Sequence, residues 1–407
     1  MDIAASQASE RHQSLDLLRG FAVLGILVMN IATIANINAF YMNPYVLGEP
    51  SSINLNAWFV NHFFADQKFY TLFSMLFGAG IMLMAQRANN KGVAAGPIHY
   101  RRMGWLLFFG LIHGYLIWYG DILATYALMG FWVYLLALNT SAKKKFIIAA
   151  VLMGLYFLMM YGISNLFYQM SEADLLEMTE MFYPSSDTIA AEVAAYRGSW
   201  AEQFDHRLDF YSEMLLNALF IGPLRIGSAM LLGMALYQTG VLTAQRSKGF
   251  YWKFLAVCLT LGVLIQYYDY RVLQQGDFNI IALFKSFGAL NSMAAVFIAL
   301  AYVAIFCLWF KSGLGLWIRH KFEAVGRMAF TNYITQSVIC TTIFYGFGFG
   351  YFAELERYQL YFIVLAIFML QLVWSELWLK KYYFGPLEWL WRSLTYGKLQ
   401  RFSRAHS

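Results

Sequence analysis

The sequence predicts an all-α fold, a polytopic integral membrane protein whose bundle contains about ten transmembrane helices. Of the 407 residues, 60% are hydrophobic and only 13% are charged, whereas about a quarter of the residues are charged in a soluble protein. The mean hydropathy is +0.52. A soluble chain of this composition would expose large apolar patches to water, which helices facing lipid avoid. We therefore expect residues 1–407 to form a single membrane domain.

Apolar runs close to the length that crosses the hydrocarbon core, about 20 residues, recur along the chain. They centre on residues 17–35, 68–85, 103–118, 122–138, 146–167, 214–237, 250–268, 280–310, 325–345 and 358–379. The run at 280–310 is overlong, which predicts a tilt or a break near Lys285 and Gly288. The first run follows a polar N-terminus and is not followed by a small-residue cleavage site, so we expect its helix to be retained.

The charges of the loops predict how the bundle is oriented. Lys and Arg gather in every second loop and in the tail at 380–407, whereas Glu and Asp dominate the loops between them. Cytoplasmic loops carry the excess of Lys and Arg, so both termini are expected in the cytoplasm and the tail is a basic cytoplasmic one. A net charge of +6 could indicate nucleic-acid binding, but its spread from loop to loop favours membrane orientation and no nucleic-acid partner. The acidic residues of the external loops include Glu49, Asp66, Asp121, Asp269 and Glu354.

One long segment, residues 168–213, interrupts the pattern between the fifth and sixth runs. It contains many acidic residues and only Arg197 and Arg207 as basic ones. The spacing of Leu175, Met178 and Phe182 suggests short amphipathic helices. We interpret the segment as an acidic external loop, either a solvated cap or, alternatively, a lid over an outward-facing site.

Charged and amide side chains within the apolar runs are functional candidates, because an unpaired charge in the bilayer costs several kcal/mol. Asp16 and Arg19 stand at i and i+3, so they can pair on one helix face. That pair is either a structural ion pair or part of an anion site. Asn30 lies three helical turns deeper in the same run, where its amide needs a partner on another helix.

His113 is the most specific single feature. It follows Arg102, which marks the inner interface, by eleven residues, or roughly 16 Å along a helix, which places it close to the midplane. A histidine there can transfer protons near neutral pH, although a buried histidine is more often only hydrogen-bonded. Asp121 lies at the outer end of the same hairpin, and along one continuous helix the two side chains could not touch.

Further polar residues could line a path between the two faces. His62 and Asp66 have a spacing that can hold a metal, but only two ligands are visible, so we expect an interfacial polar pair and no metal. Lys68 follows at the outer mouth, and the next candidates come from later runs. They are Arg225, Lys285, Arg327, Asn332, Gln336 and Glu376. A phosphate-binding loop, a zinc-binding HExxH helix and a GxSxG elbow do not occur in the sequence.

Five segments resemble one known family. They read SLDLLRGFAVLGILVMNI (14–31), KFYTLFSMLFGAG (68–80), GLIHGYLIWYGDILATYAL (110–128), VGRMAFTNYITQS (325–337) and FGPLEWLWRSLTYG (384–397). In this order they are similar to the YeiB-like family of bacterial inner-membrane proteins, domain of unknown function 418. The resemblance runs from the first helix to the tail and implies a multi-pass protein of the inner membrane.

That family is grouped with transmembrane acyltransferases, among them heparan-α-glucosaminide N-acetyltransferase and the O-acetylases of bacterial surface sugars. The resemblance implies transfer of an acyl group from cytoplasmic acyl-CoA, with acetyl-CoA as the expected co-substrate, to a glycan or lipid acceptor at the outer face. A histidine closes the first helix of the sugar O-acetylases, and Asn30 occupies that place here. His113, within the IHG and GDIL motif, is then the remaining candidate for the base.

The first hypothesis is therefore a membrane acyltransferase. His113, Asp121 and Asn30 are its candidate catalytic residues, and Asn332 or Gln336 are further candidates for stabilising the carbonyl oxygen. The substrate-binding candidates are Asp16, Arg19, Lys68, Arg101, Arg102, Arg327, Asn332 and Gln336. Among them, Arg19, Arg101, Arg102 and Arg327 are expected to hold the CoA phosphates. A transporter or flippase for a small anionic solute or lipid is the alternative, and a membrane scaffold is a third. Membrane lipids are expected partners, and a homo-oligomer is compatible with the sequence.

Overall fold

The computed structural model describes residues 12–404, except residues 138, 172–173, 176–178 and 181. These residues contain helices, a single isolated bridge between Tyr382 and Ser403, and no strand, which confirms the all-α prediction. The elements are α1 (Gln13–Ala35), α2 (Asn38–Met42), α3 (Ser52–Phe64), α4 (Lys68–Asn90), α5 (Ala95–Ile112), η2 (His113–Ile117), α6 (Leu123–Ala137), α7 (Ala142–Leu166), η3 (Phe167–Gln169), α9 (Ser186–Arg197), α10 (Trp200–Gly222), η4 (Pro223–Gly227), α11 (Ser228–Gln238), α12 (Lys248–Gln275), α13 (Ile280–Lys285), η5 (Ser286–Leu290), α14 (Asn291–Ser312), α15 (Leu316–Arg327), α16 (Ala329–Phe344), α17 (Arg357–Lys381) and α18 (Pro386–Tyr396).

Seven helical segments of the described chain are long and apolar enough to cross a membrane. They are Gln13–Ala35, Ser52–Asn90, Ala142–Gln169, Trp200–Gln238, Lys248–Gln275, Ile280–Ser312 and Arg357–Lys381. The three other expected spans, at 103–118, 122–138 and 325–345, correspond mainly to α5, α6 and α16, which are shorter or less apolar. The polytopic membrane fold is thus supported, and the count of about ten stays a prediction.

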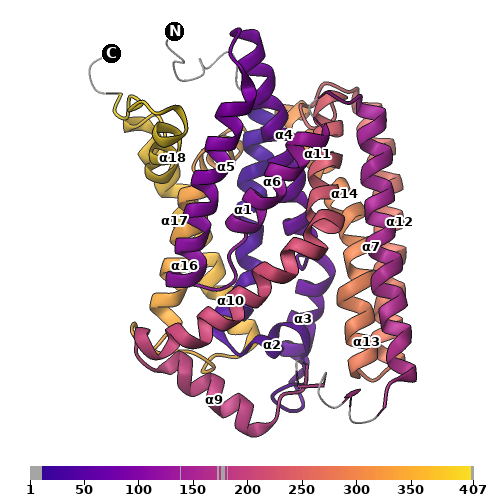
Figure 1. Ribbon diagram of the computed structural model, residues 1–407. Coiled ribbons are helices and arrows are strands. Elements are labelled where there is room, and N and C mark those ends of the chain that lie inside the picture. The colour runs from indigo at the N-terminus through magenta and orange to yellow at the C-terminus, as the bar shows by residue number, and fades with distance from the viewer. Residues whose placement is uncertain (1–11, 138, 172–173, 176–178, 181, 405–407) are drawn as a thin grey trace.

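The bundle has two chemically different ends (Figure 1). The start of α1 and helix α18 lie at one end, which we call the basic end because Arg87, Lys91 and Arg392 gather there around a cavity. Helices α2, α3, α9 and α13 lie at the opposite end, which we call the far end. The described chain therefore starts and finishes at the same end, as an even number of crossings requires.

Two helix crossings are closed by pairs of glycines. A Cβ on Gly20 of α1 would lie 1.9 Å from the Phe322 carbonyl oxygen, and one on Gly326 of α15 would lie 1.9 Å from the Asp16 carbonyl oxygen. The two backbones are in direct contact, as small residues permit in membrane helices. This crossing places Arg19, just before Gly20, near Arg327, just after Gly326. Gly78 and Gly233 close the α4–α11 crossing in the same way.

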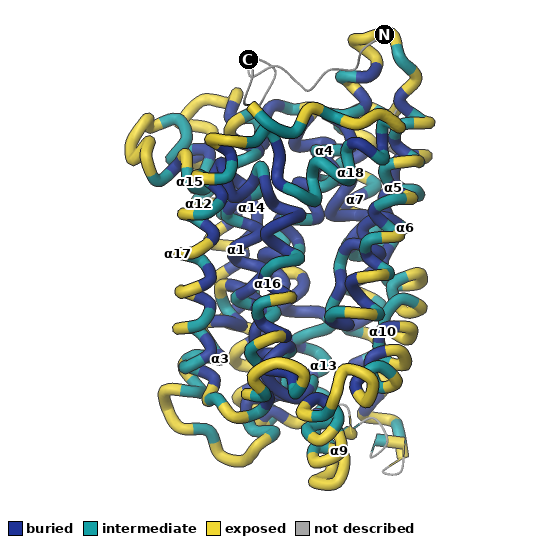
Figure 2. Tube along the Cα trace, turned by 90° about the vertical axis from the view of Figure 1, so that its left-hand side faces the viewer, coloured by how far each residue is buried: buried dark blue, intermediate teal, exposed yellow. Residues whose placement is uncertain are grey.

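The hairpin formed by α5 and α6 differs from its prediction. Its loop at Gly120–Asp121 was expected to face the external solvent, but Asp121 is only 1% exposed. The reason is helix α10, which crosses diagonally between the hairpin and the far end (Figures 1 and 2). Residues 168–213 are therefore not simply an external loop, because Gln203, Arg207 and Tyr211 of α10 are fully buried. The amphipathic helices expected around 175–182 fall partly outside the described residues.

Breaks in the long helices lie beside buried polar groups. The overlong run at 280–310 is interrupted by the π-helical turn η5, which confirms the predicted break near Lys285 and Gly288. A second π-helical turn, η4, begins at Pro223, which lacks a backbone N–H for the α-helical bond pattern. A third, η2, begins at His113. Such turns occur frequently at functional sites.

The described part of the predicted basic tail, residues 380–404, packs against the bundle. Helix α18 packs against α5, with the Trp391 indole donating to the Arg102 carbonyl oxygen at 3.0 Å. The Glu388 carboxylate accepts from the backbone N–H groups of Phe330 and Thr331 at 2.7 and 3.0 Å. The tail thereby satisfies the N-terminus of α16, whose first N–H groups have no partner within the helix.

Candidate functional site

A cavity of about 340 Å³ extends inward from the basic end between α1, α4, α5, α16 and α18. Basic side chains line its outer part, and they come from five helices or their ends, α1, α4, α5, α15 and α18. These are Arg19, Arg87, Lys91, Arg102, Arg327 and Arg392. Arg19 is paired with Asp16 at 2.8 Å, and the Arg102 guanidinium lies 4.5 Å from the centre of the Trp391 ring. Arginines in such numbers favour a ligand with several anionic groups, phosphates above all.

The inner part of the cavity is apolar and ends at aromatic residues. Leu76, Phe77 and Leu106 line its walls, and Tyr126 and Tyr333 lie among the deepest of its lining residues. The hydroxyl of Tyr333 donates to the Gly120 carbonyl oxygen and accepts from the Ile122 N–H, both at 3.3 Å. The cavity therefore changes from strongly basic to apolar along its length, and it ends against the loop between α5 and α6.

A histidine and an aspartate are paired behind this inner end. His113 Nδ1 lies 2.8 Å from Asp121 Oδ1, and both residues are 1% exposed. The other carboxylate oxygen, Oδ2, accepts from the Ala124 N–H at 2.8 Å and from the Tyr211 hydroxyl at 3.2 Å. Because the carboxylate faces Nδ1, that nitrogen carries the proton and the lone pair is on Nε2. We call this pair the dyad.

His113 Nε2 is buried and has no hydrogen-bond partner among the described residues. A buried polar atom without a partner is unusual and calls for a reason. The Tyr333 ring packs against the imidazole, with the ring centres 5.2 Å apart, and the same tyrosine lines the cavity. Tyr333 thus contacts both the dyad and the cavity.

The dyad forms because the chain reverses within a few residues. The helix loses α-helical geometry at His113 and ends at Trp118, whose backbone is extended, and the return at Gly120 brings Asp121 back to the imidazole. Arg207 of α10 holds this turn by donating to the Tyr115 carbonyl oxygen at 2.8 Å. The expectation that two residues so spaced could not touch applies to a continuous helix, and the helix is not continuous here.

The structure places the other predicted site residues in three groups. Asp16, Arg19, Arg102 and Arg327 line the cavity, as expected for one shared site. Arg101 does not line it and donates to the Thr395 carbonyl oxygen of α18 at 3.3 Å. The remaining predicted residues, which also lie outside the cavity lining, are Asn30, Lys68, Asn332 and Gln336.

Asn332 and Gln336, which were predicted to bind substrate, are bonded to neighbouring helices. The Asn332 amide donates to Ser375 Oγ at 3.0 Å, and its oxygen accepts from the Trp374 indole at 2.7 Å. The Gln336 amide donates to Gln371 Oε1 at 2.9 Å. These bonds join α16 to α17, and they leave neither side chain available as a donor at the dyad. An isolated polar residue in a helix does not reveal which neighbours satisfy it.

Several residues of the site were not predicted from the sequence. Tyr211 and Tyr333 contact the dyad, and Arg392 and Glu388 line the cavity. Burial raises the pKa of the Glu388 carboxyl, while its hydrogen bonds to Thr331 oppose that shift. Three of these residues, Tyr333, Glu388 and Arg392, lie in the motifs VGRMAFTNY and FGPLEWLWR. Their place in these motifs was the one feature of the sequence that could have marked them as site residues.

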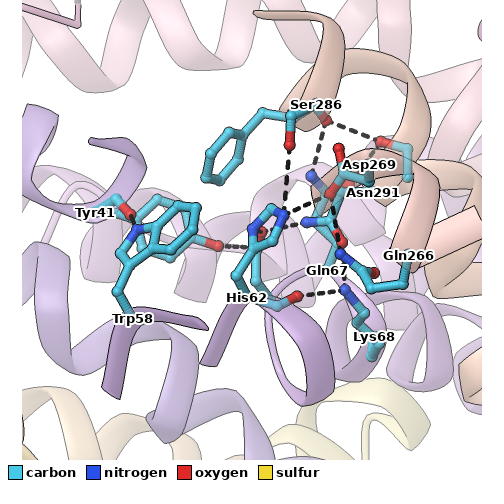
Figure 3. Close-up of polar contacts among 12 residues, drawn as sticks. Tyr41, Trp58, His62, Gln67, Lys68, Gln266, Asp269, Ser286 and Asn291 are labelled. Atoms are coloured by element: carbon cyan, nitrogen blue, oxygen red, sulfur yellow. Dashed lines mark hydrogen bonds and ion pairs between the residues drawn. The ribbon is translucent and has the colours of Figure 1, made fainter. Parts of the chain in front are cut away.

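A second buried polar cluster lies toward the far end, around the break between α3 and α4 (Figure 3). His62 Nε2 lies 2.7 Å from Asp269 Oδ2, and His62 Nδ1 lies 3.5 Å from Asp66 Oδ2. Asp66, Lys68 and Asp269 were expected at an external mouth or loop, but each is at most 1% exposed. These three residues are buried because residues of α13, η5 and α14 cover the cluster.

The chain is similar to known proteins over most of its length. A family model described as "Protein of unknown function (DUF418)" matches residues 236–398. The chain is 32% identical to the "Uncharacterized protein YxaH" of Bacillus subtilis (strain 168), over 95% of each chain. It is 30% identical to the "Uncharacterized protein YeiB" of Escherichia coli (strain K12), over 95% of this chain and 96% of that protein. No solved structure matches the chain.

Proposed function

Since the chain belongs to the YeiB-like DUF418 family, whose matched relatives are described only as uncharacterized, we propose a function from its own geometry. The protein is a membrane-embedded acyltransferase that moves an acyl group from acyl-CoA to a hydroxyl or amine of a glycan or lipid. The observation that carries the proposal is the cavity with a basic outer part, an apolar inner part and a histidine–aspartate dyad behind its inner end.

The cavity matches the chemistry of an acyl-CoA along its length. CoA carries several phosphates at one end and a thioester at the other. The arginines of the outer part suit the phosphates, because a guanidinium binds phosphate oxygens in pairs. The apolar inner part suits the pantetheine arm and the acyl group, which have no charge. In this placement the thioester lies at the end next to Tyr333 and the dyad.

The dyad supplies a general base for the transfer. His113 Nε2 accepts the proton of the acceptor hydroxyl or amine while the acceptor atom attacks the thioester carbonyl carbon. The carbon–sulfur bond then breaks, and the imidazolium returns the proton to the leaving thiolate. Asp121 keeps the proton on Nδ1 and stabilises the imidazolium that forms between the two steps.

The proposal also includes an orientation of the protein in the membrane. The basic end faces the cytoplasm of a bacterial inner membrane, so both termini are cytoplasmic. The support is the distribution of Lys and Arg among the loops, which marks cytoplasmic loops. Acyl-CoA then enters the cavity from the cytoplasm, and the acceptor approaches the dyad from the far side.

Thioester cleavage tests the proposal without knowledge of the acceptor. Purified protein in lipid nanodiscs is incubated with acetyl-CoA, with water or a supplied sugar as acceptor, and the released CoA thiol is measured. We expect His113→Ala to lower the rate by about 10²-fold or more. His99→Gln is the matched control, since His99 is also buried but bonds only the Gly130 carbonyl oxygen. Equal rates in wild type and His113→Ala would refute the assignment of the base.

A transporter or flippase for a small anionic solute or lipid is the second candidate. The observation in its favour is the buried charged cluster at the far end, which lies at interruptions of several helices, as binding sites do in many transporters. Flux of a labelled anion across liposomes in the absence of acyl-CoA would support it. Tight acetyl-CoA binding with no such flux would exclude it.

A further inference from the structure

The cluster at the far end has a feature that the proposed acyl transfer does not use. Both nitrogens of the His62 imidazole have a carboxylate oxygen nearby: Nε2 is hydrogen-bonded to Asp269 at 2.7 Å, whereas Nδ1 lies 3.5 Å from Asp66 without a hydrogen bond among the described residues. All three residues are at most 3% exposed. No other ionisable group forms an ion pair with either carboxylate within the part of the chain that the structure describes.

A neutral imidazole that donates from Nε2 to Asp269 leaves its Nδ1 lone pair beside the Asp66 carboxylate. It has one N–H and one lone pair, so one nitrogen would direct its lone pair at a carboxylate oxygen in a buried site. Such an unpaired contact between negative groups is costly where water is excluded. One further proton removes the conflict, because an imidazolium donates from both nitrogens.

The other bonds of the cluster indicate that this proton belongs to the imidazole. Asp66 already accepts from the Tyr41 hydroxyl and from the Asn291 amide. Asp269 accepts from the Gln266 amide at 2.9 Å. Each carboxylate thus receives donors that favour its anionic form, which leaves the ring between them as the base.

Two buried cations, Lys68 and Arg225, lie near the cluster and are bonded to neutral groups. The groups that contact His62 or its bonded neighbours come from every element packed around the cluster. They are Tyr41 of α2, Trp58 of α3, Asp66 and Gln67 of the α3–α4 break, Lys68 of α4, Arg225 of η4, Asp269 of α12, Ser286 and Phe287 of η5, and Asn291 of α14. Lys68 donates to the His62 carbonyl oxygen at 2.6 Å and to Asn291, and Arg225 donates to Gln67 at 2.6 Å. Neither cation therefore neutralises a carboxylate by direct contact.

We propose that the chain Asp66–His62–Asp269 is a proton-binding site inside the bundle. Protonation converts the neutral ring to an imidazolium that lies between two carboxylates. Deprotonation returns the proton to solvent and leaves the Nδ1 lone pair opposed to Asp66. Because Asp66 lies in the break between α3 and α4, loss of the proton loosens the contact that holds this break closed.

The position of the site indicates the side from which the proton comes. Asp269 lies near Gln275, the last residue of α12, about 9 Å from that helix end along the axis. The partly exposed Tyr41, whose hydroxyl donates to Asp66, belongs to α2 at the far end. The proton is therefore exchanged with the far side, opposite the cavity.

The test uses the full chain in lipid nanodiscs with ¹⁵N-labelled histidine. The ring resonances of His62, identified by their loss in His62→Gln, report whether one or both nitrogens carry a proton. We expect both to be protonated at pH 6 in wild type and one to be protonated in Asp66→Asn, because an asparagine amide can donate to the Nδ1 lone pair. The resonances of His99, which faces a carbonyl oxygen, should not change between the two proteins and serve as the folding control.

Infrared difference spectra of the same samples cover the case in which a carboxyl group holds the proton. A protonated carboxyl band that is present in wild type and absent in Asp66→Asn or Asp269→Asn also supports the site. A singly protonated His62 ring in wild type at every pH from 5 to 8, with no such carboxyl band, overturns it.

Discussion

Two of the buried histidines, His113 and His62, have opposite surroundings. At the inner end of the cavity, His113 has one carboxylate, Asp121, and an Nε2 with no partner among the described residues. At the far end, His62 has a carboxylate beside each nitrogen. One carboxylate fixes the tautomer and leaves a lone pair free to accept a proton, whereas two carboxylates keep a proton in place. The number of carboxylates therefore distinguishes a candidate base from a candidate proton store.

The largest expected effect comes from removing the carboxylate of the dyad. Asp121→Asn should lower thioester cleavage by about 10²-fold or more, because an asparagine no longer selects the tautomer with the proton on Nδ1. Cleavage of acetyl-CoA in nanodiscs is the measurement. The same variant should leave the ¹⁵N spectrum of His62 unchanged, because the two clusters share no hydrogen-bond partner in the described chain. A changed His62 spectrum would show that the two regions form one network.

The next effect separates binding from chemistry at the outer part of the cavity. Arg102→Gln should raise the KM for acetyl-CoA by about tenfold, as expected for loss of one charge-assisted phosphate contact, and leave kcat nearly unchanged. Arg246→Gln is the control, since Arg246 bonds the Thr239 carbonyl oxygen and does not line the cavity.

A thioester of dephospho-CoA, which lacks one phosphate of CoA, tests which group Arg102 binds. If Arg102 binds the phosphate that this analogue lacks, the analogue should bind equally well to wild type and Arg102→Gln. A fall in kcat with an unchanged KM would mean that Arg102 acts on the dyad and not on the anionic substrate.

The sequence predicted the membrane fold better than the site. Hydropathy reports how many residues prefer lipid, so the long apolar runs were found, together with the break near Lys285 and Gly288. It does not report whether a hairpin reaches the opposite surface, so Asp121 was expected outside. Its burial depends on α10, whose Arg207 and Tyr211 lie about 90 residues further along the chain and give no local signal.

In the candidate site, too, some residues could be predicted from the sequence and others could not. Asp16, Arg19, Arg102 and Arg327 were predicted together because they share the basic end. The contact between His113 and Asp121 could not be predicted, because it needs a π-helical turn and a reversal that no residue spacing announces. Likewise, His62 and Asp66 suggested only an interfacial pair, since the third member, Asp269, lies on α12.

The smallest expected effect tests whether the carboxylates alone retain the proton on His62. Ser286 Oγ lies 3.4 Å from His62 Nε2, farther than Asp269 Oδ2 at 2.7 Å. A bond of that length is weak, so Ser286→Ala should leave both ring nitrogens protonated at pH 6 and shift the midpoint of deprotonation by less than about half a pH unit, or ~0.7 kcal/mol. The ¹⁵N titration of His62 measures this shift. A larger shift would make the hydroxyl a third partner of the ring, and the two-carboxylate account of the difference between His62 and His113 would then be incomplete.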